Sequence, residues 1–226
     1  MTIPAIVLDT EATNVDNPEV IELAYLEFDI ADKTMQSPIH SQRFKPATPP
    51  AWGALAVHHI LMEELEGARP SEVAASHVPP AQYWIGHNVD FDWKALGQPP
   101  ARRICTLAMC RSIWPKVDSH SLVAMMYYLC GANRATRDLV RGAHGAATDI
   151  HLTRIILHQI LQFEEISDLE TLWQFSEEAR IPKTFSFGKF KGQPISAADR
   201  GYANWYARQP DPDPYLLQAF KRARLL

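Results

Sequence analysis

The sequence predicts a mixed α/β domain that is followed by a small C-terminal module. Strand-like segments come first and helical segments follow, which is the order of a sheet covered by helices. The composition changes near residue 180, where Phe, Lys and Gly begin to interleave. The 226 residues, 46% of them hydrophobic, suffice for one substantial core and a smaller unit. We therefore expect a domain over residues 1–178 and a module over residues 179–226.

Strands are expected where β-branched, aromatic or apolar residues run together between turn residues. Five segments have this composition: 3–11, 20–30, 35–44, 83–86 and 103–106. A turn at Asp32–Lys33 joins the second segment to the third, so these two should form an antiparallel hairpin.

Helices are expected where apolar residues recur at a spacing of three and four. Short helices should occupy the region 51–77, and further helices are expected over 88–96, 107–113, 121–130, 134–142 and 147–163. Asn88 is a preferred residue type for a helix N-cap, so the first of these should begin there.

Charge and composition exclude membrane and secretory classes more clearly than they indicate a ligand. The net charge of −4 does not point to a nucleic-acid-binding protein, although such a protein needs only a local basic surface. No apolar run approaches the ~20 residues that span a bilayer. Residues 1–12 lack the pattern of a secretory signal, and Cys105, Cys110 and Cys130 lack a CxxC spacing. We expect a cytoplasmic protein with reduced thiols and no membrane partner.

Five polar residues in three separated segments carry most of the functional information: Asp9, Glu11, Asp92, His144 and Asp149. Each segment alone has an ordinary explanation, namely an acidic strand end, an acid near the positive end of a helix dipole, and a histidine in a flexible loop. Together they supply the oxygen ligands that Mg²⁺ prefers and a side chain that titrates near neutrality. The set therefore indicates a two-metal phosphodiester hydrolase.

The three segments resemble the motifs of the DEDD superfamily of 3′→5′ exonucleases. LDTEAT (8–13) is similar to the first motif and GHNVDFDW (86–93) to the second. HGAATD (144–149) is similar to the third, with the spacing of the histidine-containing subgroup rather than the tyrosine one. AVHHI (56–60) resembles the segment in which a histidine contacts the nucleotide. The resemblance covers roughly residues 1–165.

This resemblance implies a ribonuclease H-like fold with a mixed five-stranded sheet flanked by helices. It implies two divalent cations, Mg²⁺ or Mn²⁺, whose ligands are Asp9, Glu11, Asp92 and Asp149. It assigns His144 as the general base for the attacking water and gives Glu11 a share in catalysis. The substrate-binding residues that it implies are Thr10, Ala12, His58, Asn88 and Arg141.

A second resemblance, to the exodeoxyribonuclease X group, extends over nearly the whole chain. It is carried by ICTLAMCRSIWP (104–115) and by TFSFGKFKGQPISAADRGYANWY (184–206). The chain departs from the family pattern at Ala12, Asn14 and His59. None of these departures removes a ligand, so they affect the fit of the terminal nucleotide rather than the chemistry.

Three arginines precede His144 at a spacing of three and four: Arg134, Arg137 and Arg141. On a helix they share one face, where they would hold phosphates of the approaching strand. The alternative is an ordinary solvated face, with Asp138 as a partial partner.

The C-terminal module interleaves lysines with phenylalanines between residues 183 and 191. Basic residues beside aromatic rings suit a single-stranded nucleic acid. Phe185 and Phe187 are two apart, however, and residues at that spacing share one face of a strand. We expect both phenylalanines to be buried and to serve packing.

These resemblances predict a 3′→5′ exonuclease that releases 5′-mononucleotides from the 3′ end of DNA, single-stranded or duplex, in repair or end processing. Three alternatives stay open. They are an exoribonuclease of the ribonuclease T or oligoribonuclease type, a proofreading subunit of a polymerase, and a catalytically silent protein that binds nucleic acid. The C-terminal resemblance favours DNA over RNA, and the likeness to ribonuclease T raises the expectation of a homodimer.

Overall fold

The computed structural model describes residues 3–32 and 37–226. The chain divides into two compact units, Met1–Ser176 and Glu177–Leu226. This division lies close to the expected boundary at residue 178.

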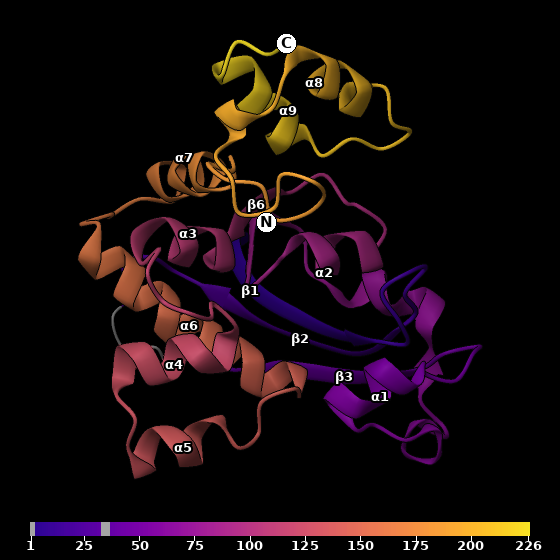
Figure 1. The fold of residues 1–226 in the computed structure, drawn as a ribbon. Coiled ribbons are helices and arrows are strands. Elements are labelled where there is room, and N and C mark those ends of the chain that lie inside the picture. The colour runs from indigo at the N-terminus through magenta and orange to yellow at the C-terminus, as the bar shows by residue number, and fades with distance from the viewer. Residues whose placement is uncertain (1–2, 33–36) are drawn as a thin grey trace. The chain divides into compact units, whose positions relative to one another are not determined.

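The first unit is built on a mixed sheet, which in the described residues has six strands in the order β4-β3-β2-β1-β5-β6 (Figure 1). The strands are β1 (Ile3–Ala12), β2 (Val20–Phe28), β3 (His40–Lys45), β4 (Arg69–Pro70), β5 (Ala81–Gly86) and β6 (Arg102–Cys105). β2 pairs with β1 in antiparallel orientation, whereas β5 is parallel to β1 and β6 is parallel to β5. β1 is therefore a central strand, and the carboxyl ends of β1, β5 and β6 meet at one edge of the sheet.

The expectation of five strands is wrong by one strand. The additional strand is β4, two residues long, which pairs in parallel with the end of β3. So short a strand has no alternating pattern, and Pro70 within it argues against a strand in the sequence. The expected hairpin is present as β2 and β3, although β3 begins only at His40. Lys33 of the expected turn and Met35 at the expected strand start lie outside the described residues.

Helices cover the sheet of the first unit, and α6 is the longest of those described. The α-helices are α1 (Trp52–His58), α2 (Asp90–Ala95), α3 (Thr106–Ile113), α4 (Leu122–Cys130), α5 (Arg134–Val140), α6 (Ala146–Phe163) and α7 (Leu169–Ala179), the last of which crosses the division between units. Two 3₁₀ helices, η1 (Met62–Leu65) and η2 (Ser71–His77), follow α1. α6 contacts β1 and β2 and has α3 and α4 beside it (Figure 1). None of the helices described is long and apolar enough to cross a membrane.

The chain turns sharply between β5 and α2, and this turn corrects one expectation. Asn88 is not the N-cap, because α2 begins at Asp90 with Val89 in the cap position. Asn88 instead has a φ of +83°, in the left-handed region that Asn tolerates better than most residues. Gly86 permits the close approach, since a Cβ there would lie 3.1 Å from the Cβ of Val89. The turn brings α2 back over the end of β1.

The second unit contains η3 (Ile195–Ala197), α8 (Arg200–Ala207) and α9 (Pro214–Arg222). Both α-helices have side-chain caps, from Asp199 and Asp213. Ile181, Phe185, Leu216 and Phe220 are among the residues of its small core. Helices and loops thus form this small core, and no sheet contributes to it in the residues described here.

The segment that interleaves Phe and Lys is a loop rather than a strand. A single bridge between Thr184 and Pro194 closes it, and Gly188 within it has a φ of +70°. Phe185 is buried as expected, at 3% exposure. The expectation for Phe187 is wrong, because its side chain is 47% exposed. The period of two that would bury both rings holds only for an extended strand.

Candidate active site

Three carboxylates converge at the carboxyl end of β1. Asp9 and Glu11 are two apart on this strand and point to the same side, and Asp149 lies in the first turn of α6. One carboxylate oxygen from each of the three lies within 4.8 Å of the others. This spacing allows all three to contact one cation.

Asp92 on α2 is tied to the same strand through Thr10. Its Oδ1 accepts hydrogen bonds from the backbone N–H of Thr10 at 2.8 Å and from the Thr10 hydroxyl at 2.7 Å. Asp92 is 3% exposed, so these bonds hold a buried carboxylate beside the residue that separates Asp9 from Glu11. Thr10, which the resemblance implies as a substrate contact, therefore positions a carboxylate.

His144 lies on the turn that leads into α6. Its backbone N–H donates a hydrogen bond to Oδ1 of Asp149 at 3.1 Å. Its φ is +70°, a conformation that few residues other than glycine adopt. The side chain is exposed, and its ring makes no hydrogen bond within the described part of the chain. The backbone thus holds His144 next to a carboxylate while its ring stays available.

Glu22 is a fifth acid at this site that the sequence motifs did not include. It is directly opposite Glu11 in the β1–β2 pair and is 8% exposed. Its Oε2 accepts a hydrogen bond from the backbone N–H of Ala146 at 2.9 Å, and its Oε1 accepts one from Nε of Arg43 at 3.3 Å. Glu22 therefore holds the start of α6 against the sheet. The signal in the sequence was a single acid inside the apolar run VIELAYL.

Burial and mutual repulsion raise the pKa of these carboxyl groups. Burial is the larger cause for Asp9, whose pKa lies well above its ordinary value, and repulsion from Asp92, Asp149, Glu11 and Glu22 adds to it. Burial, together with repulsion from the nearby acids, raises the pKa of Glu11 to about 8.

Hydrogen bonds to Asp149 and Asp92 only partly offset the effect of burial. Burial raises the pKa of Asp149 to about 6, although the backbone N–H of His144 stabilises the ionised form. Burial also raises the pKa of Asp92 to about 7, against the hydrogen bonds from Thr10. Near neutral pH such a cluster takes up protons or a cation. An all-oxygen donor set of buried and half-buried acids fits a hard divalent cation.

His58, at the end of α1, presents an unpaired ring nitrogen. Its Nδ1 accepts a hydrogen bond from the backbone N–H of Ile60 at 2.9 Å. Its Nε2 is buried without a hydrogen-bond partner among the described residues. Burial lowers the pKa of His58, which favours the neutral ring. Because Nδ1 accepts a hydrogen bond, the proton of the neutral ring lies on Nε2. A buried donor without an acceptor is a position for a ligand atom.

The other residues implied as substrate contacts are placed differently. Ala12 is buried at the end of β1 and Asn88 is exposed on the β5–α2 turn. Arg141 follows α5, and its guanidinium lies 3.5 Å from a carboxylate oxygen of Asp138. Arg134 and Arg137 also lie within 3.8 Å of Asp138. All three arginines share one acidic partner.

Comparison with known proteins finds exonucleases among the proteins that this chain resembles. No protein-family model matches the chain. It is 26% identical over 203 residues to exodeoxyribonuclease 10 of Escherichia coli strain K12, a match that covers 88% of each chain. The exodeoxyribonuclease 10 of Escherichia coli O6:H1 matches with the same values.

Solved structures show the same fold. Exonuclease X in complex with 5′-overhanging duplex DNA matches with a TM-score of 0.61 and 21% identity, over 76% of this chain and 99% of that chain. The zinc-bound complex of Escherichia coli exonuclease I with single-stranded DNA matches with a TM-score of 0.57 and 16% identity, over 81% of this chain and 44% of that one. The chain has the ribonuclease H-like exonuclease fold and is a relative of the DEDDh exonucleases.

Proposed function

We propose that this chain is a metal-dependent 3′→5′ exonuclease that acts on DNA and releases 5′-mononucleotides. One observation carries the proposal: carboxylate oxygens of Asp9, Glu11 and Asp149 lie within 4.8 Å of one another. The similarity to exodeoxyribonuclease 10 over 88% of both chains supports DNA as the substrate. A cytoplasmic role in repair or end processing belongs to the same proposal and agrees with free Cys105, Cys110 and Cys130.

The acids of the site suit two divalent cations, Mg²⁺ or Mn²⁺. Asp9, Glu11 and Asp149 would hold them, together with the oxygen of Asp92 that Thr10 does not engage. When bound, such cations polarise the phosphodiester and lower the pKa of a bound water. The raised pKa of Glu11, about 8, means that cations and protons compete for these oxygens.

His144 is the general base of the proposed reaction. Its ring takes a proton from the attacking water, the water oxygen bonds to phosphorus, and the bond from phosphorus to the 3′ oxygen breaks. The leaving 3′ oxygen takes a proton from solvent. The hydrogen bond from the backbone N–H of His144 to Asp149 positions the turn. Gly142 and Gly145, on either side of His144, allow its ring to approach the substrate and withdraw from it.

His58, Asn88, Arg141 and Ala12 form the proposed contacts with the terminal nucleotide and its strand. His58 has the most specific role, because its Nε2–H is a buried donor without an acceptor among the described residues. It would donate a hydrogen bond to an oxygen of the terminal nucleotide. Arg141 would contact a phosphate further along the strand.

The alternatives receive less support. An exoribonuclease uses the same carboxylates, but the similarity to exodeoxyribonuclease 10 favours DNA. A catalytically silent binding protein does not require five buried or converging acids, and a polymerase-associated role has no observation that favours it. Matched DNA and RNA oligonucleotides decide the substrate, and light scattering tests the homodimer expected from resemblance.

The test measures release of the terminal mononucleotide from a 3′-labelled oligonucleotide. Asp9→Asn should lower the rate by about 10³-fold or more, because the lost stabilisation amounts to several kcal/mol. His144→Ala should lower it by about 10²–10⁴-fold. Metal binding, followed by calorimetry, should fall in Asp9→Asn and persist in His144→Ala.

Asp118→Asn is the matched control, since Asp118 is an exposed acid outside the cluster. Undiminished activity in either site variant contradicts the proposal.

A further inference from the structure

The second unit exposes aromatic rings that its core does not need. Phe187 is 47% exposed and Trp205 is 55% exposed, whereas Phe185 and Phe220 fill the core at 3% and 0%. This unit also has nine lysines and arginines against five aspartates and glutamates. Exposed rings on a basic unit are not explained by packing.

The rings form a connected surface on α8 and the loop before it. Tyr202 contacts Trp205 at 5.4 Å between centroids, and Tyr206 contacts Phe187 at 6.2 Å. Both tyrosines also contact the buried ring of Phe220, at 6.2 and 5.9 Å. The inner tyrosines are thus anchored on the core and support the two exposed rings. We call Phe187, Tyr202, Trp205 and Tyr206 the ring face.

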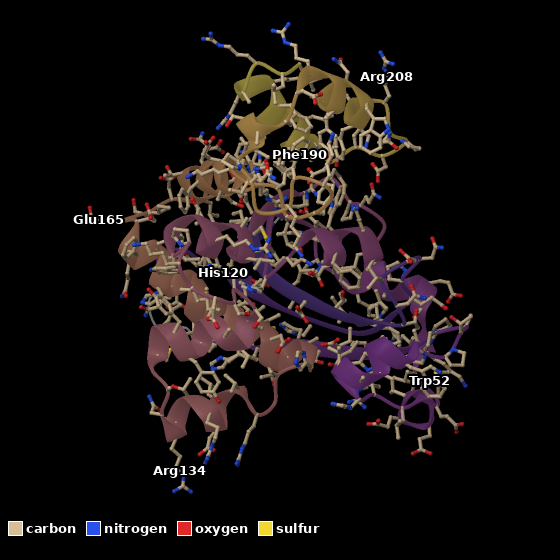
Figure 2. The ribbon with its side chains drawn as sticks, in the orientation of Figure 1. Trp52, His120, Arg134, Glu165, Phe190 and Arg208 are labelled. Atoms are coloured by element: carbon tan, nitrogen blue, oxygen red, sulfur yellow. The ribbon has the colours of Figure 1, made fainter. Side chains whose placement is uncertain are left out.

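Cations border the ring face. Nζ of Lys189 lies 5.1 Å from the centroid of Tyr202 and 4.7 Å from that of Phe190. Arg208 follows Trp205 at the end of α8, where Figure 2 shows its side chain reaching outward. Lys189, Lys191 and Arg208 are exposed, and none of them pairs with an acid in the part of the chain that the structure describes. Their charges are available to an anion.

We propose that the ring face and its three cations bind single-stranded nucleic acid. Bases stack on Phe187 and Trp205, and phosphates lie near Lys189, Lys191 and Arg208. Rings interleaved with cations suit a strand in which every nucleotide offers a flat base and a negative charge. The excess of positive charge favours this ligand over an apolar protein partner. The surface lies in a different unit from the carboxylate cluster, and its binding does not require metal or catalysis.

Binding of the full chain to a fluorescent oligothymidylate of about 20 nucleotides, in EDTA, tests the proposal. The probe exceeds the ~4–16 nucleotides that a small module occupies. The double variant Phe187→Ala/Trp205→Ala should raise Kd on the order of tenfold, because two bases no longer stack on the protein. Trp205→Phe should retain most of the affinity, because it keeps a ring. Thermal unfolding confirms that the variants are folded.

The contribution of the cations to binding is tested by the salt dependence of the affinity in two matched double variants. Lys189→Ala/Lys191→Ala should weaken binding and reduce the slope of log K against log salt by about 0.7 for each phosphate that the protein no longer neutralises. Lys221→Ala/Arg224→Ala removes the same charge from α9 and the residues after it, outside the ring contacts, and should leave both the affinity and the slope nearly unchanged.

Several outcomes overturn the proposal: no binding by the wild type in EDTA, an unchanged Kd in the ring variant, or an equal weakening in the control pair. Equal affinity for duplex also overturns it, because stacked bases in a duplex are not free. A separate assay, hydrolysis of a trinucleotide in the presence of Mg²⁺, distinguishes a failure of this binding proposal from a failure of the proposed exonuclease activity. The ring variants should hydrolyse it normally, and a wild type that fails to do so contradicts only the proposed exonuclease.

Discussion

The two units of this chain carry net charges of opposite sign, and they differ in whether charged side chains are buried or exposed. The first has 21 acidic residues against 13 basic ones, and Glu11, Glu22 and Asp92 are almost fully buried. The second has an excess of cations, and Lys189 and Lys191 are exposed. Buried charges interact strongly and individually, whereas exposed ones are screened by salt. Substitutions should therefore have large, position-specific effects in the first unit and small, salt-dependent effects where charges are exposed.

The largest effect outside the proposed ligands and base is expected at Glu22. Glu22→Ala leaves the backbone N–H of Ala146 unsatisfied and Arg43 without one of its partners, so the start of α6 shifts with Asp149 and His144. A misplacement of ~1 Å at a catalytic group costs about 10²-fold in rate. Steady-state kinetics should show this decrease in kcat.

Glu22→Gln is the matched variant, because it keeps an acceptor for Ala146 and removes the charge. It should retain more activity than Glu22→Ala. If Glu22→Ala has the kcat of the wild type, buried acids in this unit do not act individually and the contrast between the units fails.

A second, intermediate effect is expected in the pH dependence of the metal-free protein. Glu11, Asp92 and Asp149 have pKa values of about 8, 7 and 6 in the folded state, against ordinary values of 4.5, 3.8 and 3.8. A group with a raised folded pKa stabilises the fold below its unfolded pKa and loses that contribution as pH rises through the folded value. The melting temperature in EDTA should therefore fall from about pH 4, where these groups ionise in the unfolded chain, to about pH 8, the highest of the three folded pKa values.

Added Mg²⁺ should raise the melting temperature more at high pH than at low pH, because the ligands must be deprotonated. Glu11→Gln should flatten the decline in EDTA, since the folded pKa of Glu11 lies highest of the three. A decline of unchanged steepness in that variant shows that other groups cause it.

The order of the elements was predictable because hydrophobic periodicity and turn residues are local signals. β1, β2 and α6 appear close to their expected ranges for that reason. Two features were not predictable, because neither follows from a local pattern. The short strand β4 depends on pairing with the end of β3. The exposure of Phe187 depends on a loop where a strand was expected.

The candidate site was predictable as a set of residues and not as a network. The period of two placed Asp9 and Glu11 on one side of a strand. The role of Thr10 in holding Asp92 depends on how α2 returns over β1, and the role of Glu22 depends on the register of β1 with β2. Tertiary pairing decides both. The net charge of −4 was similarly uninformative, because it sums two units of opposite sign.

The smallest effect is expected at the arginines around α5, where exposed cations lie on the acidic unit. Arg141 is 68% exposed and shares Asp138 with Arg134, which is 87% exposed. Arg141→Ala should raise KM for single-stranded DNA about threefold at low salt, because one screened interaction with a phosphate disappears, and not at high salt. Arg134→Ala, at the far end of the helix from His144, is the matched control and should change KM less. A fall in kcat for Arg141→Ala would contradict this expectation, because a screened exposed charge cannot act on the chemical step. Arg141 would then behave like the buried acids. In that case exposure would not be the property that separates charges with small effects from charges with large ones.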